Sequence, residues 1–474
     1  MIVRISKLSW TSFAALGLWS CASPEPQPLD PRKSETEFRA RTLEDPGLRR
    51  FAEANQVAKP APFPPEAWDL GALTLAAFYY QPELDLARAR LGQARAAGVT
   101  AGMWPNPVAG VTVENVTNAA AGIKPWIYGF SLSVPLDTLW KRGYKVEEAE
   151  RRGDAALLAL AEAGWRVRGR LRAALAEHLF AIRDLELRRL EEEVRVDVVA
   201  ALERRLSLGE IFRLDVDAGR GELSNARLAV HTAEGRVAES RAALAAAVGV
   251  PHSALKGKTF AWPELESPPP LASLSLESAQ SAGLLNRIDL QGLFAEYAAA
   301  EAGLKREVAS RYPDVSIGPG LLNDQGDKKL TLGLSITLPV FNQNEGPIAE
   351  ADARRKEVAA RFYQVQAAAI GEVESASERY VAALAELGEA EKTLAMIERR
   401  EQATRRAIEL KELDKTALTG LRLERVQART SRLGALKHAQ DAFGALEDAV
   451  QRPLGHGSPV PVPGSSSPRE EEKR

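Results

Sequence analysis

Residues 311–355 read RYPDVSIGPGLLNDQGDKKLTLGLSITLPVFNQNEGPIAEADARR, and they contain two alternating runs of apolar and polar side chains. Across residues 329–339, apolar side chains alternate with polar or small ones without a break. A period of two residues is typical of a β-strand with one apolar and one polar face. A shorter alternating run occupies residues 315–318, and the polar residues 323–327 separate the two runs. The stretch therefore predicts a β-hairpin.

The same pattern occurs earlier in the chain. Residues 129–136 read GFSLSVPL and residues 333–340 read GLSITLPV, so the two segments match in character at an offset of 204 residues. Upstream of each hairpin, Trp104-Pro-Asn corresponds to Tyr312-Pro-Asp. A repeat of this length indicates that one architectural unit has been duplicated. We therefore expect two β-hairpins, one at 108–136 and one at 313–340.

The composition is that of a globular protein and excludes some partners. The chain has 474 residues, of which 45% are hydrophobic and 27% charged, and its formal net charge is −2. Nucleic-acid binding requires a concentrated basic face, so no nucleic-acid partner is expected. Beyond the N-terminus, no run of eighteen apolar residues occurs, and no transmembrane helix is expected.

The N-terminus is predicted to be a targeting segment, residues 1–20. It begins with Arg4 and Lys7, continues as a short apolar stretch, and ends with Leu18-Trp-Ser before Cys21, the only cysteine. This pattern resembles a bacterial lipoprotein signal, so Cys21 is the predicted site of lipidation. The alternative is an ordinary signal peptide with an incidental cysteine. A single cysteine excludes an internal disulfide.

Three segments are predicted to lie outside the main elements. Residues 21–66 are rich in proline and charge, and we expect an extended tether with one short helix near residues 48–55. Residues 251–282 contain three consecutive prolines and form the expected connector between the repeats. Residues 455–474 have the composition of a disordered tail.

Two long proline-free tracts are predicted to be helical. They are dominated by Ala, Leu, Glu and Arg, which are strong helix formers. Each tract is interrupted once, near 206–210 and near 412–416, by glycine or by capping residues that favour a tight turn. We therefore expect helical hairpins at 143–248 and 346–450. Together with a helix and a β-hairpin each, they define repeats at 67–250 and 283–454.

The predicted strands of one chain would leave an apolar sheet face uncovered. Four strands cannot close a barrel, and helices that extend far beyond the strand ends cannot cover an apolar sheet face. Strands of about ten residues with alternating apolar and polar side chains are typical of outer-membrane barrels. If several copies pool their strands and helices, one barrel and one helical tube result. The alternative is a soluble sheet that packs on one side.

These features resemble the TolC family of outer-membrane efflux proteins over residues 70–454. The segment LPVFNQNEG at 338–346, followed by IAEADA, is most similar to the cobalt–zinc–cadmium (CzcC-like) heavy-metal efflux branch. The resemblance implies a mainly α-helical homotrimer with a membrane β part. Four strands per chain would form a twelve-stranded outer-membrane β-barrel, and four long helices per chain a periplasmic α-barrel. It also implies a place in the Gram-negative outer membrane, where the predicted lipid on Cys21 would anchor the protein.

The function implied by the resemblance is that of a passive exit duct in a tripartite efflux system. A periplasmic adaptor, or membrane fusion protein, would couple the duct to a proton-driven inner-membrane pump of the RND type. Heavy-metal cations are the expected cargo. A drug-efflux or type I secretion duct is an alternative. Alternatives from another class are the periplasmic adaptor itself and a structural envelope lipoprotein, although an adaptor should have one helical hairpin and this chain has two.

Candidate contact residues follow from position in the chain. Pro135 and Pro339 mark the strand-to-helix junctions. The mid-tract turns would be the periplasmic tips, and the candidates for adaptor contact there are Leu208, Gly209, Glu210, Leu413 and Asp414. Around a trimer axis, Glu210 and Asp414 would form carboxylate rings, which favour cations. The alternative is that both are helix caps or solvated charges.

No catalytic constellation is present in the sequence. The five histidines are scattered and lack the spacing of metal ligands, and His178 is expected to be interhelical or solvated. No nucleophile motif or phosphate-binding loop occurs. We expect no enzymatic activity, no cofactor and no metal site.

Overall fold

The computed structural model describes residues 26–55, 63–119, 122–136, 138–271, 286–410 and 416–454. Several predictions lie outside these described residues: the targeting segment 1–20, the lipidation site Cys21, the tail 455–474, and the turn residues Leu413 and Asp414. The chain divides into two compact units, residues 1–41 and 42–474. In the first unit, α2 (Pro31–Arg39) begins where the Asp30 carboxylate accepts hydrogen bonds from two backbone N–H groups.

The second unit is mainly helical, as the sequence predicts. Its α-helices are α3 (Pro46–Asn55), α4 (Leu70–Tyr80), α5 (Pro82–Gly102), α6 (Thr138–Ser207), α7 (Arg213–Val248), α9 (Ile288–Ala309), α10 (Glu345–Glu409) and α11 (Thr416–Val450). Two 3₁₀ helices, η1 (His252–Leu255) and η2 (Pro263–Glu266), lie in the connector. With 70 residues, α6 is about 105 Å long. A helix of that length must bury its apolar stripe against neighbours along its whole course.

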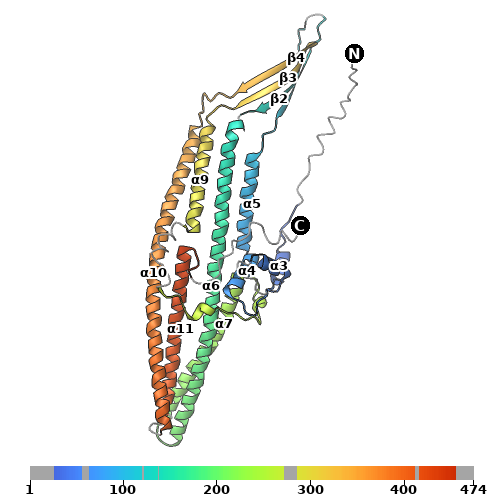
Figure 1. Cartoon of the computed structure of the whole chain (residues 1–474). Coiled ribbons are helices and arrows are strands. Elements are labelled where there is room, and N and C mark those ends of the chain that lie inside the picture. Colours follow the sequence, from blue (N-terminus) through green and yellow to red (C-terminus); the bar gives the residue numbers. More distant parts are fainter. Residues whose placement is uncertain are drawn as a thin grey trace. The chain divides into compact units, whose positions relative to one another are not determined.

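Those neighbours are the returning helices and the shorter helices of each repeat. α7 packs along α6, and α11 packs along α10, so each repeat has its helical hairpin (Figure 1). α6 also contacts α5, α9 and α11, which brings the two repeats side by side. Figure 1 shows the strands beyond one end of the long helices and the α6–α7 turn at the other.

The four strands form one antiparallel sheet in chain order. They are β1 (Val108–Asn115), β2 (Trp126–Pro135), β3 (Val315–Asp324) and β4 (Asp327–Ile336). The hairpin pairs β1–β2 and β3–β4 are the two hairpins that the sequence predicts. The two hairpins also pair with each other, because β2 lies against β3 in a continuous antiparallel register. The outer edges of β1 and β4 have no partner strand in the described part of the chain.

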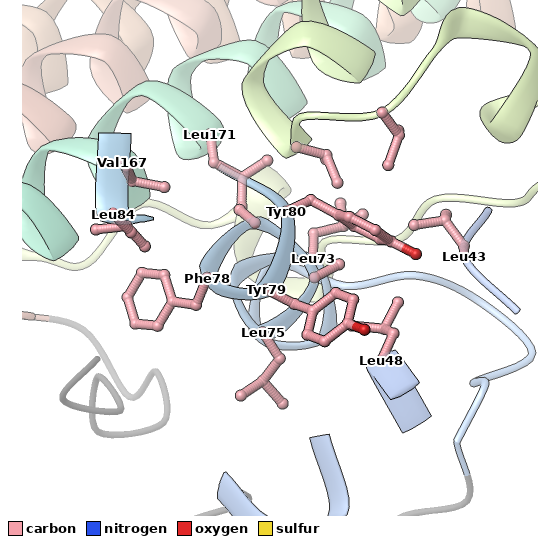
Figure 2. Packing of buried hydrophobic residues seen from close by; sticks show 14 of the residues in the cluster. Leu43, Leu48, Leu73, Leu75, Phe78, Tyr79, Tyr80, Leu84, Val167 and Leu171 are labelled. Atoms are coloured by element: carbon pink, nitrogen blue, oxygen red, sulfur yellow. The ribbon is translucent and has the colours of Figure 1, made fainter. Parts of the chain in front are cut away.

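The largest apolar core surrounds α4. Eight of its eleven residues are buried, among them Leu73, Phe78 and Tyr80, and α6 and α7 contribute further apolar side chains (Figure 2). Trp68, which precedes α4, pairs with the connector: its N–H donates to Thr259 O (2.9 Å), and its carbonyl accepts from Ala261 N–H (3.1 Å).

Part of the segment expected to be an extended tether belongs to this core. Leu43 and Leu48 are fully buried against α4, and Phe63 packs edge-on against Trp68. The Tyr80 hydroxyl donates to the carbonyl of Thr42 (2.8 Å). The described residues 42–55 therefore differ from an extended tether, because their few apolar side chains are spaced to pack on α4.

Candidate functional site

One face of the sheet is apolar and exposed. The strand register gathers Val111, Val113, Trp126, Tyr128, Phe130, Val134, Val315, Ile317, Leu321, Leu330, Leu332, Leu334 and Ile336 on it. We call this the apolar face. In β4, Leu330 is 82% exposed, and none of the described helices covers the strand. An apolar patch of this size on a surface marks contact with another apolar phase or partner, and a strand pattern of this kind suits lipid.

The opposite face is lined mainly by glycine and hydroxyl side chains. One row across the four strands is Gly110, Ser131, Gly320 and Thr331. A Cβ on Gly110 would lie 2.8 Å from Ser131 Oγ, and one on Gly320 would lie 2.7 Å from Thr331 Oγ1. Glycine therefore alternates with larger residues because this face is crowded, as expected on the inside of a curved sheet. We call it the polar face.

Prolines stand where the sheet passes into the helices. Pro135 is the last residue of β2, and Leu136 N–H donates to Val315 O (2.7 Å). Pro339 follows β4 by three residues, after Thr337 N–H donates to Asp314 O (3.0 Å). A proline cannot donate to a sheet ladder. Both predicted junction residues therefore lie at the points where strand pairing stops.

The α6–α7 turn is a compact cap that presents apolar side chains to solvent. Gly209 has φ of +77°, and its N–H donates to Leu206 O while Glu210 N–H donates to Arg205 O, both at 3.0 Å. These two bonds are the Schellman arrangement of a helix C-terminus. Leu208, a predicted contact residue, is 73% exposed.

Two exposed apolar residues beside this turn are not among the contact residues predicted from the sequence. Phe212 is 83% exposed and Leu214 is 78% exposed, although both are large and apolar. The turn between them and α6 is fixed, because Phe212 N–H donates to the Asp215 carboxylate (3.0 Å). An apolar residue just before a helix whose third residue is Asp is the signal that could have identified Phe212.

Glu210 forms an ion pair within its own turn. Its carboxylate lies 3.1 Å from Arg205 Nε, and both side chains are about half exposed. The structure therefore places Glu210 beside a cation at the tip. Its candidate partner in the second turn, Asp414, lies outside the described residues.

A side chain at the start of α5 and one at the start of α9 each donate hydrogen bonds to carbonyls at the end of another helix. The Gln81 side-chain amide donates to the carbonyls of Ala246 and Ala247 at the end of α7, each at 2.7 Å. Near the corresponding place in the second repeat, Arg287 donates to Ala449 O at the end of α11 (2.6 Å). Each contact satisfies carbonyls that a helix terminus leaves free. The duplication thus extends to the way each repeat closes on itself.

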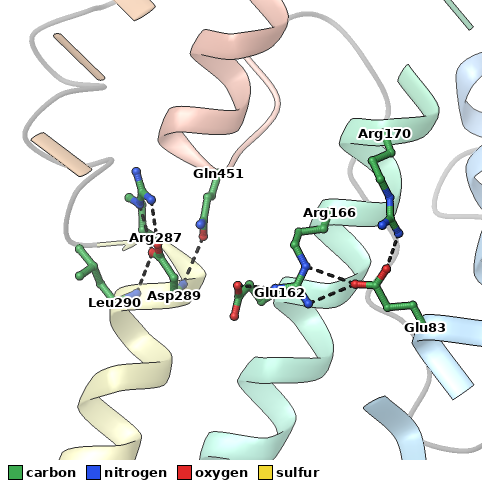
Figure 3. A network of polar contacts seen from close by, with 8 residues as sticks. All are labelled: Glu83, Glu162, Arg166, Arg170, Arg287, Asp289, Leu290 and Gln451. Carbon is green, nitrogen blue, oxygen red and sulfur yellow. Dashed lines mark hydrogen bonds and ion pairs between the residues drawn. The ribbon is translucent and has the colours of Figure 1, made fainter. Parts of the chain in front are cut away.

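Ion pairs lie close to both of these contacts, at the starts of α5 and α9 (Figure 3). The Glu83 carboxylate in α5 accepts from Arg166 and Arg170 of α6. Burial acts to raise the pKa of Glu83, but the hydrogen bonds and charges of the two arginines outweigh it, so this pKa lies below its ordinary value. In the second repeat, Arg287 pairs with the Asp289 carboxylate (2.7 Å), and the Asp289 backbone N–H donates to Gln451 Oε1 (3.2 Å).

His178 lies between helices and not in a ligand set. It is buried, and its Nδ1 is 3.0 Å from Ser240 Oγ of α7. Burial, with a smaller contribution from Arg241, lowers the pKa of His178 below its ordinary value. In the described ranges, His, Cys, Asp and Glu side chains nowhere gather as a group of three that could hold a metal ion. None of the helices there combines the length and apolar character needed to cross a membrane.

Comparison with known proteins gives a consistent family likeness. The sequence profile of the family described as outer membrane efflux protein matches residues 79–250. The cobalt-zinc-cadmium resistance protein CzcC of Cupriavidus metallidurans is 27% identical over 282 residues, which cover 57% of this chain. The chain thus spans 60% of the length of that curated relative.

Several solved structures share the fold. A membrane protein from Pseudomonas aeruginosa superposes with a TM-score of 0.63 at 16% identity, covering 83% of this chain and 96% of that one. The outer membrane protein VceC of Vibrio cholerae gives 0.62 at 18% identity, covering 80% and 95%. The open state of the Neisseria gonorrhoeae MtrE outer membrane channel gives 0.62 at 16%, covering 80% and 88%. At these identities the likeness concerns the fold.

Proposed function

Because this chain belongs to the outer membrane efflux protein family, the family of TolC, we propose that it is the outer-membrane exit duct of a tripartite efflux system. The family consists of channels and not of enzymes. In this role the protein is a passive conduit, and an inner-membrane pump coupled through a periplasmic adaptor supplies the energy.

The observation that carries the proposal is a sheet that is incomplete in one chain. Its apolar face is exposed, and the edges of β1 and β4 are unpaired within the described residues. Open edges and bare apolar faces are both unfavourable in water. Three copies related by a threefold axis would pair β4 of one chain with β1 of the next and close twelve strands, with the polar face inward.

The long helices support the same assembly. α7 and α10 lie at the outer sides of the helical array formed by α7, α6, α11 and α10. Both carry exposed apolar side chains, including Leu228 on α7 and Tyr363, Val381 and Met396 on α10. Their burial against a neighbouring copy would stabilise a helical tube beneath the barrel.

Heavy-metal cations are the cargo we propose, on the strength of the likeness to CzcC. A duct need not hold its cargo tightly, because conduction requires sites weak enough to release it. Hydrophobic drugs are the alternative cargo.

The tips are the proposed adaptor contacts. At the first tip, Leu208, Gly209 and Glu210 are joined by Phe212 and Leu214, which give the turn an apolar surface with charged flanks. Exposed apolar residues around a rigid turn are suited to an interface core. Leu413 and Asp414 remain candidates at the second tip, and Cys21 remains the proposed site of lipidation and anchoring.

Two measurements test the proposal. The first is the conductance of the purified protein in planar bilayers, where stable open channels are expected and their absence would contradict the duct. The second is a susceptibility panel on a deletion strain and its complemented parent, with zinc, cobalt, cadmium, copper and hydrophobic drugs. Metal hypersensitivity that complementation rescues would support the cargo. Sensitivity to drugs alone would overturn the metal cargo and leave the duct in place.

A further inference from the structure

An exposed aromatic side chain stands at each of the four places where the sheet meets the helices. Trp104 precedes β1, Trp140 follows β2, Tyr312 precedes β3, and Phe341 follows β4. All four are exposed, and Phe341 is completely so. Aromatic rings that are apolar but polarisable favour the boundary between lipid and water. We call these four residues, with the cations beside them, the junction collar.

Three cations of the junction collar lack a carboxylate partner among the described residues: Arg142, Lys145 and Arg311. Arg142 Nε donates to Gly102 O (2.8 Å), and its guanidinium carbon lies 5.5 Å from the centre of the Trp104 ring. Arg311 donates to the neutral Gln343 side chain (2.7 Å). Arg142 and Arg311 are thus oriented by neutral groups while their charges are unmatched.

The rest of the long helices behaves differently. Most arginines there face a carboxylate of the same or a neighbouring helix, as Arg166, Arg227 and Arg422 do. Lys141, within the junction itself, is also satisfied, because it lies 2.5 Å from Asp314 and donates to Tyr312 O. The junction collar differs from the long helices because its three unmatched cations lie beside exposed aromatic rings, and this combination points to an anionic partner outside the chain.

The length of the strands places the junction collar at one boundary of the membrane. β4 has ten residues, so it is about 34 Å long, and tilted by about 45° it spans about 24 Å along a barrel axis. This height equals the apolar band of an outer-membrane barrel, about 25 Å. Trp126 and Tyr128 stack at the turn end of the apolar face. The junction collar lies at the other end, where the helices begin.

We propose that the junction collar binds anionic phospholipid headgroups of the periplasmic leaflet, with Arg142, Lys145 and Arg311 contacting phosphate and the aromatic rings lying at the acyl boundary. This inference rests on the proposed outer-membrane function. A guanidinium held over an indole keeps donors free for a phosphate oxygen, and arginine suits phosphate geometrically. The bound lipid would fix the depth of the barrel at the end from which the helices extend.

The test is lipid titration of the full-length protein in detergent, followed by native mass spectrometry. Phosphatidylglycerol is the anionic probe, and phosphatidylcholine of the same chain length is the zwitterionic comparison. Replacing the three cations together (Arg142→Gln, Lys145→Gln and Arg311→Gln) should weaken phosphatidylglycerol binding by about fivefold per cation. Phosphatidylcholine binding should not change. Equal binding of phosphatidylglycerol by parent and variant would overturn the proposal.

A matched variant controls for net charge. Arg236→Gln, Lys256→Gln and Arg379→Gln remove three exposed cations that also lack a carboxylate partner in the described ranges but lie away from the strands. Phosphatidylglycerol affinity should stay at the parent value, and a loss equal to that of the collar variant would mean a general charge effect and overturn the site.

A second readout does not depend on headgroup affinity. In bilayers with lipids brominated near the headgroup, the Trp104 fluorescence should be quenched, and Trp104→Phe should remove that quenched component. Bilayer conductance of the same preparations separates the two proposals. Open channels without quenching or headgroup preference would overturn the junction collar alone, whereas a protein that neither inserts nor conducts would overturn the duct and the junction collar together.

Discussion

At the scale of single residues, Gly209 holds the first tip in a conformation that other residues resist. Its φ of +77° costs an L-residue with a Cβ about 1–2 kcal/mol. Gly209→Ala should therefore loosen the turn without a clash, because nothing lies within 4 Å of the added Cβ. We expect backbone amide exchange at Gly209 and Glu210 to accelerate by about 5- to 30-fold.

The matched control is Gly235→Ala, in the interior of α7, where φ is helical and the site is open. Alanine is the better helix former by about 1 kcal/mol, so this variant should slow exchange around residue 235. Unchanged exchange at the tip of the Gly209 variant would show that the turn is not held by this backbone conformation.

The polar face depends on glycine for space and not for backbone conformation. In Gly320→Ala, the new methyl group would lie 2.7 Å from Thr331 Oγ1 and 3.0 Å from the carbonyl oxygen of Phe130. The backbone oxygen cannot move away cheaply, so the sheet should lose about 1–3 kcal/mol. Gly333→Ala places its methyl group no closer than 3.6 Å to any atom and should be tolerated. Thermal unfolding followed by circular dichroism distinguishes the two, and equal melting temperatures would contradict a crowded inner face.

At the scale of elements, period and composition were sufficient to predict both hairpins and both helical hairpins. The β2–β3 pairing could not be predicted in this way, because it joins residues almost two hundred positions apart, with α6, α7 and α9 between them in the chain. The same holds for Leu43 and Leu48, whose proline-rich surroundings indicate a tether while their contacts with α4 place them in a core. Local patterns specify an element, whereas its partner depends on surfaces that only the folded chain brings together.

The ion pairs of Glu83 with Arg166 and Arg170, which join α5 to α6, should be sensitive to acid. The lowered pKa of Glu83 means that its carboxylate is stabilised in the folded state, so it contributes stability above its ordinary value of 4.5. That contribution is lost as the pH falls through the lowered pKa. Glu83→Gln should lower the unfolding free energy by on the order of 1 kcal/mol at pH 7, because the pair is partly exposed.

The pH dependence identifies the cause. The difference between parent and Glu83→Gln should shrink as the pH falls below 4.5, since the parent carboxylate is then protonated as well. Glu53→Gln, which breaks an exposed pair with Arg49, should change stability by less than about 0.5 kcal/mol at either pH. A Glu83 effect that persisted in acid would instead reflect lost packing.

At the scale of the whole molecule, ion pairs across the helical array show which residues lie at the same height. Glu222 of α7 pairs with Arg195 of α6 (3.2 Å), and two residues further along α6, Asp197 pairs with Arg422 of α11 (2.8 Å). Arg425 of α11 in turn pairs with Glu401 of α10 (2.8 Å). Glu222 and Glu401 are therefore close to level with each other.

Leu228 lies six residues farther from the tip than Glu222 on α7, and Met396 lies five residues farther from the tip than Glu401 on α10. Both are therefore displaced from that level by about 8–9 Å in the same direction. Both are exposed and apolar. A rotation about a threefold axis parallel to the helices leaves the height of a residue along that axis unchanged. In a Cys21→Ser background, Leu228→Cys with Met396→Cys should therefore form disulfides between copies and yield covalent trimers on a non-reducing gel. Leu228→Cys paired with Tyr363→Cys, which is 33 residues from Met396 along α10 and thus about 50 Å away, should not. If both pairs gave only monomers, α7 and α10 of neighbouring copies would not meet, and the closed duct would need a different arrangement of its helices.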